Sequence, residues 1–212
     1  NEEILIEKHL ELGTYIINNS AASNLDDQNF HSIINALNDF NEKFKFIEPQ
    51  EIPGYLPAQR CRAARAIFIP REGWLNSKMI LGALELALKK SGKVIYKDNK
   101  VVSLNKSDKT IVGLQLDDGD QLLGDIFLVA NGAGAGDLIK ASKLELNIQP
   151  IFYGIGVSLE LKSQDDQLKN CVRSPNRGGT CGIYAVPIFL GPDKPKDHFM
   201  VGASNFLSPT PY

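Results

Sequence analysis

The chain has few of the residues that mark several common classes of protein. Its 212 residues contain only three cysteines, Cys61, Cys171 and Cys181, an odd number without the paired spacing of zinc ligands or of a disulfide framework. Its three histidines share no local pattern with a serine, a cysteine or an acid. We therefore expect reduced thiols, no metal site and no hydrolase triad.

Long apolar runs and charge of one sign are also lacking. No stretch approaches the eighteen or so apolar residues of a membrane span, and no charged-then-apolar signal opens the chain, so a cytoplasmic location is the default expectation. The formal net charge of -2 gives no electrostatic reason to expect nucleic acid or an anionic membrane as partner. Because the first residue is Asn1 rather than Met, we expect that a preceding segment has been removed.

The most informative stretch combines an apolar run with a glycine-rich turn. Five consecutive apolar residues, 126–130, are too few for an isolated helix and lack alternation, which favours a strand buried on both faces of a parallel sheet. Gly132, Gly134 and Gly136 follow, and a helix is expected to begin at Asp137. A strand, a glycine turn and a helix start in this order predict a phosphate site.

The match to a dinucleotide fingerprint is partial. That fingerprint needs glycine at its first, third and sixth positions, and the sixth position counted from Gly132 is Asp137. A tight strand-to-helix turn that needs glycine only for its backbone angles explains the same residues. Both interpretations stay open at this point.

The preceding residues supply a context for that turn. Asn76 can cap a helix with one continuous apolar face that ends at Gly92. Three short strands are then expected, separated by polar turns, at residues 93–97, 100–105 and 110–116. Helix, strands, apolar run and glycine turn follow one another as they do in a nucleotide-binding fold.

Residues 66–136 resemble the middle of the flavin-dependent amine oxidoreductases typified by D-amino-acid oxidase and glycine oxidase. The resemblance is carried by Glu72-Gly-Trp-Leu-Asn76 before a long helix and by Ala130-Asn-Gly-Ala-Gly134 after an apolar strand. Further on, Cys181-Gly-Ile-Tyr-Ala-Val-Pro187 and Met200-Val-Gly-Ala-Ser204 are similar to two strands of the family's substrate domain. No single motif is specific, but their shared order and spacing are.

This resemblance implies a cofactor and a set of contacts. The cofactor would be FAD, with Val101 contacting the adenine through its backbone. Ala130, Asn131, Gly132 and Gly134 would lie against the cofactor, although Gly134 stands where the family has an aromatic residue. Tyr184 would face the substrate; a half-buried sheet tyrosine is the other interpretation of this residue. The resemblance assigns no catalytic residue.

The remaining segments complete a mixed α/β (α+β) prediction with three regions. Residues 1–75 form a lead-in of two helices, at 2–13 and 27–44, and a proline-containing loop. Residues 76–145 form part of a Rossmann-like FAD-binding domain. Residues 146–212 form part of an antiparallel substrate-binding sheet. The opening glycine fingerprint and the substrate-anchoring arginine of the resembled family are absent, so the chain is expected to be a middle piece that is inactive and self-associates.

Three functional hypotheses follow. The first is part of an FAD-dependent oxidoreductase that oxidises the C–N bond of an amino acid or similar amine by hydride transfer to flavin. The second is a non-catalytic α/β module that binds a nucleotide or a protein partner, favoured by Gly134 and by the lack of an obvious acid, base or nucleophile. The third, a nicotinamide dehydrogenase, needs an acidic residue about 20 positions after the glycines. Glu160 lies roughly there, but in a segment with antiparallel character.

Overall fold

A computed structural model describes residues 10–19, 23–146, 148–163, 168–175, 182–188, 197–202 and 206–209. The chain divides into two compact units, Asn1–Gly92 with Gly156–Asn205, and Lys93–Ile155 with Phe206–Tyr212. The domain boundaries expected after residues 75 and 145 stay predictions.

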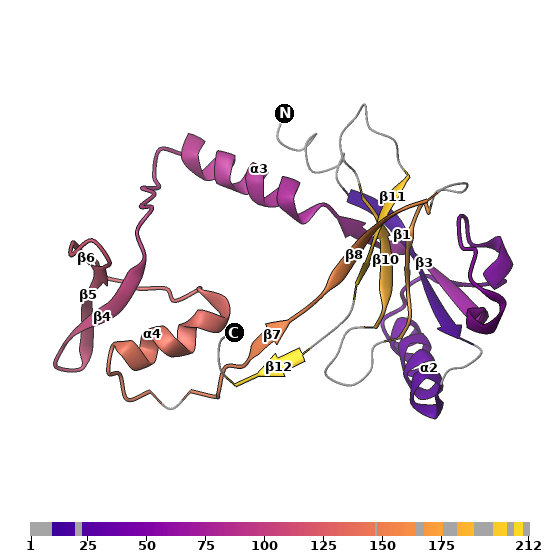
Figure 1. Cartoon of the computed structure of the whole chain (residues 1–212), viewed down its shortest axis with the longest axis horizontal. Coiled ribbons are helices and arrows are strands. Elements are labelled where there is room, and N and C mark those ends of the chain that lie inside the picture. Colours follow the sequence, from indigo (N-terminus) through magenta and orange to yellow (C-terminus); the bar gives the residue numbers. More distant parts are fainter. Residues whose placement is uncertain are drawn as a thin grey trace. The chain divides into compact units, whose positions relative to one another are not determined.

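The first unit is built on a sheet, of which β1, β3, β8, β10 and β11 are labelled in Figure 1. The order of its described strands is β2-β3-β1-β9-β10-β11-β8. Its seven described strands are β1 (Leu10–Asn19), β2 (Lys45–Ile47), β3 (Ala63–Leu75), β8 (Ser158–Lys162), β9 (Cys171–Arg173), β10 (Tyr184–Pro187) and β11 (His198–Gly202). Neighbours pair antiparallel except β1 and β9, which are parallel. The mixed α/β fold class is thereby confirmed.

The prediction of a helix over residues 2–13 is wrong for residues 10–13, the part that the structure describes. Residues 10–13 lie in β1, which pairs with β3 from Leu10 to Asn19. The leucine spacing suggested a helix, but Tyr15, Ile16 and Ile17 follow directly, and such aromatic and β-branched residues favour a strand. Residues 1–9 lie outside the described part of the chain.

Helix α2 (Asn24–Asp39) confirms the helix expected in residues 27–44 and covers one face of the sheet. Its Phe30, 1% exposed, packs with Ile16 of β1 and with Ile67 and Ile69 of β3. These side chains recur at every second strand residue, as they must to share one face. They form a core between α2 and the sheet.

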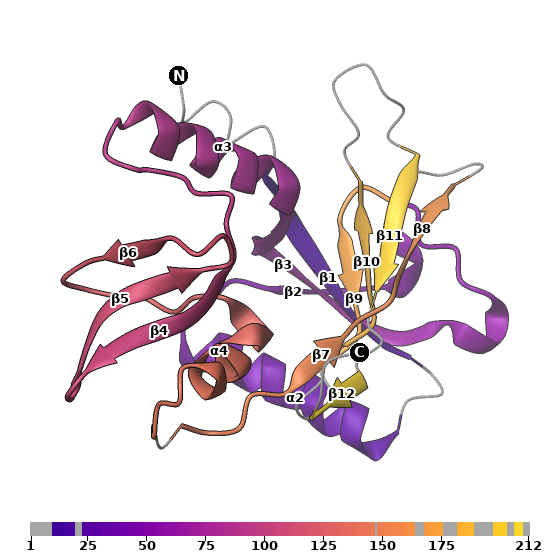
Figure 2. The ribbon, with the colours of Figure 1, turned by 60° about the vertical axis from the view of Figure 1, so that its left-hand side comes forward.

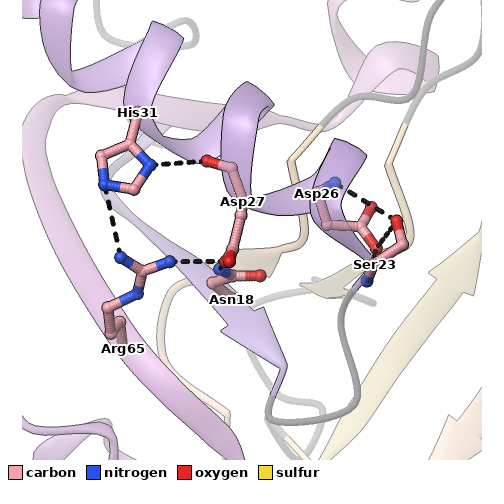
Figure 3. A network of polar contacts seen from close by, with 6 residues as sticks. All are labelled: Asn18, Ser23, Asp26, Asp27, His31 and Arg65. Carbon is pink, nitrogen blue, oxygen red and sulfur yellow. Dashed lines mark hydrogen bonds and ion pairs between the residues drawn. The ribbon is translucent and has the colours of Figure 1, made fainter.

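A polar network fixes the first turns of α2 to the strands beneath it (Figure 3). Ser23 and Asp26 form a reciprocal capping box at the helix start. Asp27 accepts hydrogen bonds from Asn18 of β1 and from Arg65 Nη2 of β3, the latter at 2.6 Å. His31 Nδ1 donates to the Asp27 carbonyl, which leaves its Nε2 to accept from Arg65 Nη1 at 3.4 Å.

The opposite face of the sheet carries a second core. Ile52, Ala66 and Val172 are buried together, with Tyr15 and Ile17 of β1 packed against them. Ile52 belongs to the connection that joins β2 to β3 through two short 3₁₀ turns, Pro49–Glu51 and Gln59–Cys61. This connection therefore covers part of the face that α2 does not.

Helix α3 (Ser77–Lys90) follows β3 as the sequence predicts. Asn76 caps it by accepting from the Met79 N–H at 3.2 Å, and Gly92 follows its end with a φ of +65°. No α3 side chain is buried, so the apolar face of this helix is largely exposed. No helix within the described ranges has both the length and the apolar character needed to cross a membrane.

The second unit is smaller (Figure 2). Its elements are the antiparallel sheet of β4 (Val101–Ser107), β5 (Thr110–Leu116) and β6 (Gln121–Leu123), helix α4 (Ala135–Ala141), and the pair β7 (Tyr153–Ile155) and β12 (Phe206–Ser208). The strands expected at 100–105 and 110–116 are confirmed. The strand expected at 93–97 is not formed, because its side chains are exposed and no described strand pairs with it.

Candidate functional site: a groove beside residues 126–131 and the Tyr184 face of the sheet

The apolar run 126–130 is not the buried strand that its composition predicts. Its residues belong to no ladder among the described strands, and Ile126 and Leu128 are 92% and 89% exposed. Phe127 is half-buried, so the side chains alternate as in an extended chain. An apolar run becomes a buried strand only when other strands pair with it, and the described residues supply none.

This exposed run leads us to expect self-association when the 212-residue chain is studied alone. Leu128→Asp should reduce association, because it places a charge on the exposed side of an unpaired apolar segment. Sedimentation velocity at several protein concentrations measures this effect. Leu56→Asp is the matched control, since Leu56 is 74% exposed in the other unit. A monomeric wild-type chain, or an equal effect of the two substitutions, would contradict the prediction.

The same segment forms one wall of a groove of about 490 Å³ in the second unit. Leu104, Leu114 and Leu138, from β4, β5 and α4, line it beside residues 126–131. Val101, Ala130 and Asn131 also line it. Three of the five residues predicted to contact the cofactor therefore meet at one concave surface, although about thirty positions separate Val101 from the other two.

Gly132 and Gly134 are the other two residues predicted to contact the cofactor. They directly follow this wall, in a 3₁₀ turn at Gly132–Gly134. Gly132 has a φ of +57°, where glycine is favoured, and a Cβ atom there would meet no atom of the chain within 4 Å. A Cβ at Gly134 would lie 3.3 Å from Asn131 Nδ2. The turn thus presents open backbone at Gly132, which suits close approach of a planar ligand.

The start of α4 gives little support to the expected phosphate site. The helix has seven residues, and Asp137 places a carboxylate in its first turn. The Tyr153 hydroxyl donates to that carboxylate, which raises the pKa of Tyr153. A fixed negative charge at this point opposes a phosphate.

Helix α4 is held against β4 by one serine. Ser142 Oγ accepts from the Leu104 N–H at 2.7 Å and donates to the Leu138 carbonyl at 2.6 Å. These bonds fix the distance between the two elements that bound the groove. Two of the elements that line the groove are therefore fixed relative to each other.

Tyr184 lies in the first unit, on β10. It is directly opposite Gly202 of β11 and Arg173 of β9. A Cβ atom at Gly202 would collide with the Tyr184 ring, so the ring lies across β11 where that strand has no side chain. Strands were expected at 181–187 and 200–204, and the structure has them at Tyr184–Pro187 and His198–Gly202. Cys181, Ala203 and Ser204 lie outside the described residues.

An ion pair near this face was not predicted from the sequence. Arg173 donates to Glu72 through Nε at 2.8 Å and Nη2 at 3.2 Å, and so connects β9 to β3 across the intervening β1. Cys171 is a buried free thiol in the same strand, and burial raises its pKa. Cys61 is also free. Among the described residues, no group of three or more His, Cys, Asp or Glu side chains is placed to hold a metal ion.

Comparison with known proteins assigns the chain to a family. Residues 8–211 match the family model described as DAO, FAD dependent oxidoreductase, and the chain belongs to that family. No curated protein matches the chain.

Solved structures show the same fold. L-proline dehydrogenase from P. horikoshii and glycine oxidase from Geobacillus kaustophilus each superpose with a TM-score of 0.71, at 17% and 19% identity. They cover 95% and 97% of this chain, and the chain covers 51% and 52% of theirs. The L-amino acid deaminase from Proteus vulgaris superposes with a TM-score of 0.66 at 15% identity. The match covers 96% of this chain and 44% of the deaminase chain. The chain thus spans about half the length of these relatives.

Proposed function

We propose that the chain is part of an FAD-dependent oxidoreductase that oxidises the C–N bond of an amino acid or similar amine. The observation that carries the proposal is the family match over residues 8–211, supported by the meeting of Val101, Ala130 and Asn131 at one groove. Bound FAD would supply the acceptor for the hydride that leaves the carbon next to the amine.

The residues of this chain would position the two reactants. Val101, Ala130 and Asn131 would hold the uncharged part of FAD in the groove, with Gly132 allowing close contact through its backbone. Tyr184, set across β11 by the space at Gly202, would contact the substrate. Such chemistry needs orientation and exclusion of water more than it needs an acid or base, which agrees with the lack of a triad in the sequence.

The absorbance spectrum of the full-length protein tests this function. Flavin bands that bleach anaerobically on addition of an amino acid or amine, and return with an acceptor, are expected. Flavin bands that bleach with dithionite but with no member of an amine panel would contradict amine oxidation. A colourless protein that gains no bands on incubation with FAD would instead favour a non-catalytic binding module.

The contact with Val101 can be tested separately. Val101 begins β4 and pairs with Leu116. Val101→Ile should retain flavin almost normally, because the expected contact is through the backbone, whereas Val101→Pro removes the N–H and should release flavin. The flavin-to-protein absorbance ratio measures both, and a thermal melt separates lost binding from lost folding. Equal flavin contents in the two folded variants would show that Val101 makes no such contact.

A further inference from the structure

Four neighbouring strands place one residue each in a single row that includes Tyr184. Tyr184 of β10 lies directly opposite Arg173 of β9 and Gly202 of β11, and Gly202 lies directly opposite Ser158 of β8. Residues that lie directly opposite each other on paired strands belong to the same face of the sheet. The whole row therefore belongs to the face on which Tyr184 is proposed to contact the substrate.

The tip of the Tyr184 ring rests on the backbone of β11. A Cβ atom at Gly202 would collide with Cζ and Oη of Tyr184 and would lie 2.8 Å from its Cε2. Gly202 is buried although it has no side chain, which agrees with a ring that covers it. The ring thus reclines across the sheet instead of standing out from it.

Within the row, the space for the reclining ring lies on the β11 side. On the β9 side, the Arg173 side chain is fixed by hydrogen bonds to Glu72, from Nε at 2.8 Å and from Nη2 at 3.2 Å. On the β11 side, Gly202 presents only backbone, and the next residue of the row, Ser158, has a short side chain. A side chain at position 202 would therefore drive the ring away from the surface of the sheet.

The identity of the colliding atoms shows which part of the protein would move. All three belong to the end of the tyrosine side chain, and none belongs to the backbone. Rotation about the side-chain bonds of Tyr184 can relieve the collision and leave the pairing of β10 with β11 intact. At Gly182, by contrast, a Cβ atom would collide with the backbone oxygens of Ser174 and Pro175. We therefore expect Gly202→Ala to fold, with the Tyr184 ring raised above the sheet.

We propose that Gly202 is a positioning residue that fixes the height of the Tyr184 ring and thereby determines how large an amine the substrate site admits. A ring that reclines over Gly202 leaves the space above it to the substrate. A raised ring takes part of that space, so a larger amine loses more affinity than a smaller one. The proposal rests on the function proposed above, because the site is the one assigned to Tyr184.

Fluorine NMR of the full-length protein labelled with 3-fluorotyrosine tests the position of the ring. The signal that disappears in Tyr184→Phe identifies Tyr184. In Gly202→Ala this signal should move by more than its linewidth while the other tyrosine signals stay in place, because the collision involves the Tyr184 ring alone. An unmoved signal would overturn the proposal, and the measurement needs neither substrate nor turnover.

Anaerobic stopped-flow reduction of the bound flavin measures the consequence for substrates. It gives a dissociation constant and a limiting rate for each amine of a panel that contains glycine and both enantiomers of alanine, proline and phenylalanine. Gly202→Ala should raise the dissociation constant at least about fivefold, most strongly for the largest amine that reduces the wild-type flavin. The limiting rate should change less than about twofold, because the raised ring affects the space for binding and not the reacting atoms.

Gly154→Ala is the matched control. Gly154 of β7 also lies opposite a large side chain, Leu207 of β12, but a Cβ atom there would come no closer to the chain than 3.8 Å. Gly154→Ala should change both constants less than about twofold. Equal effects of Gly202→Ala and Gly154→Ala would make the contact between Tyr184 and Gly202 purely structural and would overturn the proposal. Failure of Gly202→Ala alone to fold would do the same, since it would show that the ladder yields and not the ring.

A double substitution tests whether Gly202 acts through Tyr184. In a Tyr184→Leu protein no ring remains to be displaced, so adding Gly202→Ala should change the dissociation constants less than about twofold. An effect as large as that in the wild-type background would overturn the proposal.

The two proposals fail in different ways. If no amine of the panel reduces the flavin, amine oxidation fails, and the role of Gly202 in substrate size fails with it. If amines reduce the flavin and Gly202→Ala binds them as the wild type does, only the role of Gly202 fails.

Discussion

Replacing Phe30 by alanine is expected to lower the free energy of unfolding by about 3–5 kcal/mol, the usual cost of removing a buried phenylalanine. Phe30 is 1% exposed, and its ring fills the space between α2 and Ile16, Ile67 and Ile69. The Arg65 guanidinium lies 5.2 Å from the ring centroid, so truncation also removes a cation–π contact. The loss is large because the sheet beneath α2 cannot collapse into the cavity.

Urea unfolding followed by circular dichroism measures the effect, with Phe40→Ala as the matched control. Phe40 is the C-cap of the same helix and is 80% exposed, so its truncation should change stability by less than about 0.5 kcal/mol. Equal losses for the two substitutions would mean that α2 does not pack on this face of the sheet.

The sequence predicts well those features whose causes are local. The cap at Asn76 and the positive φ of Gly92 define α3, and both are visible as residue types at the expected spacing. The family resemblance likewise placed strands at 181–187 and 200–204, close to the observed Tyr184–Pro187 and His198–Gly202. Each of these elements is determined by residues within a few positions of one another.

The errors arise where long-range pairing decides the structure. Residues 10–13 have helix-like leucine spacing but are paired with β3, more than fifty positions away. Residues 126–130 have the composition of a buried strand, and no described strand pairs with them. Local composition carries no information about such partners.

In the candidate site, too, some residues are predictable from the sequence and others depend on long-range pairing. Val101, Ala130 and Asn131 were predicted from a family resemblance, and the groove brings them together. The fit of Tyr184 against Gly202 and the Arg173–Glu72 pair depend on strand register, which the sequence alone does not give. A glycine directly opposite an aromatic residue becomes informative only when the strand pairing is known.

Gly132→Val is expected to abolish flavin retention in the full-length protein while leaving most of the fold intact. A Cβ atom there would meet no atom of the chain within 4 Å, so a larger side chain would extend into the space beside the groove that we assign to the cofactor. The φ of +57° adds a local backbone cost of about 1–3 kcal/mol for a β-branched residue.

Gly132→Asn separates the two causes, because asparagine tolerates this conformation yet still fills the space. Both variants should elute without flavin bands and melt within a few degrees of each other. A yellow Gly132→Val protein would remove Gly132 from the cofactor site, and a yellow Gly132→Asn with a colourless Gly132→Val would show that backbone geometry, not space for the ligand, requires the glycine.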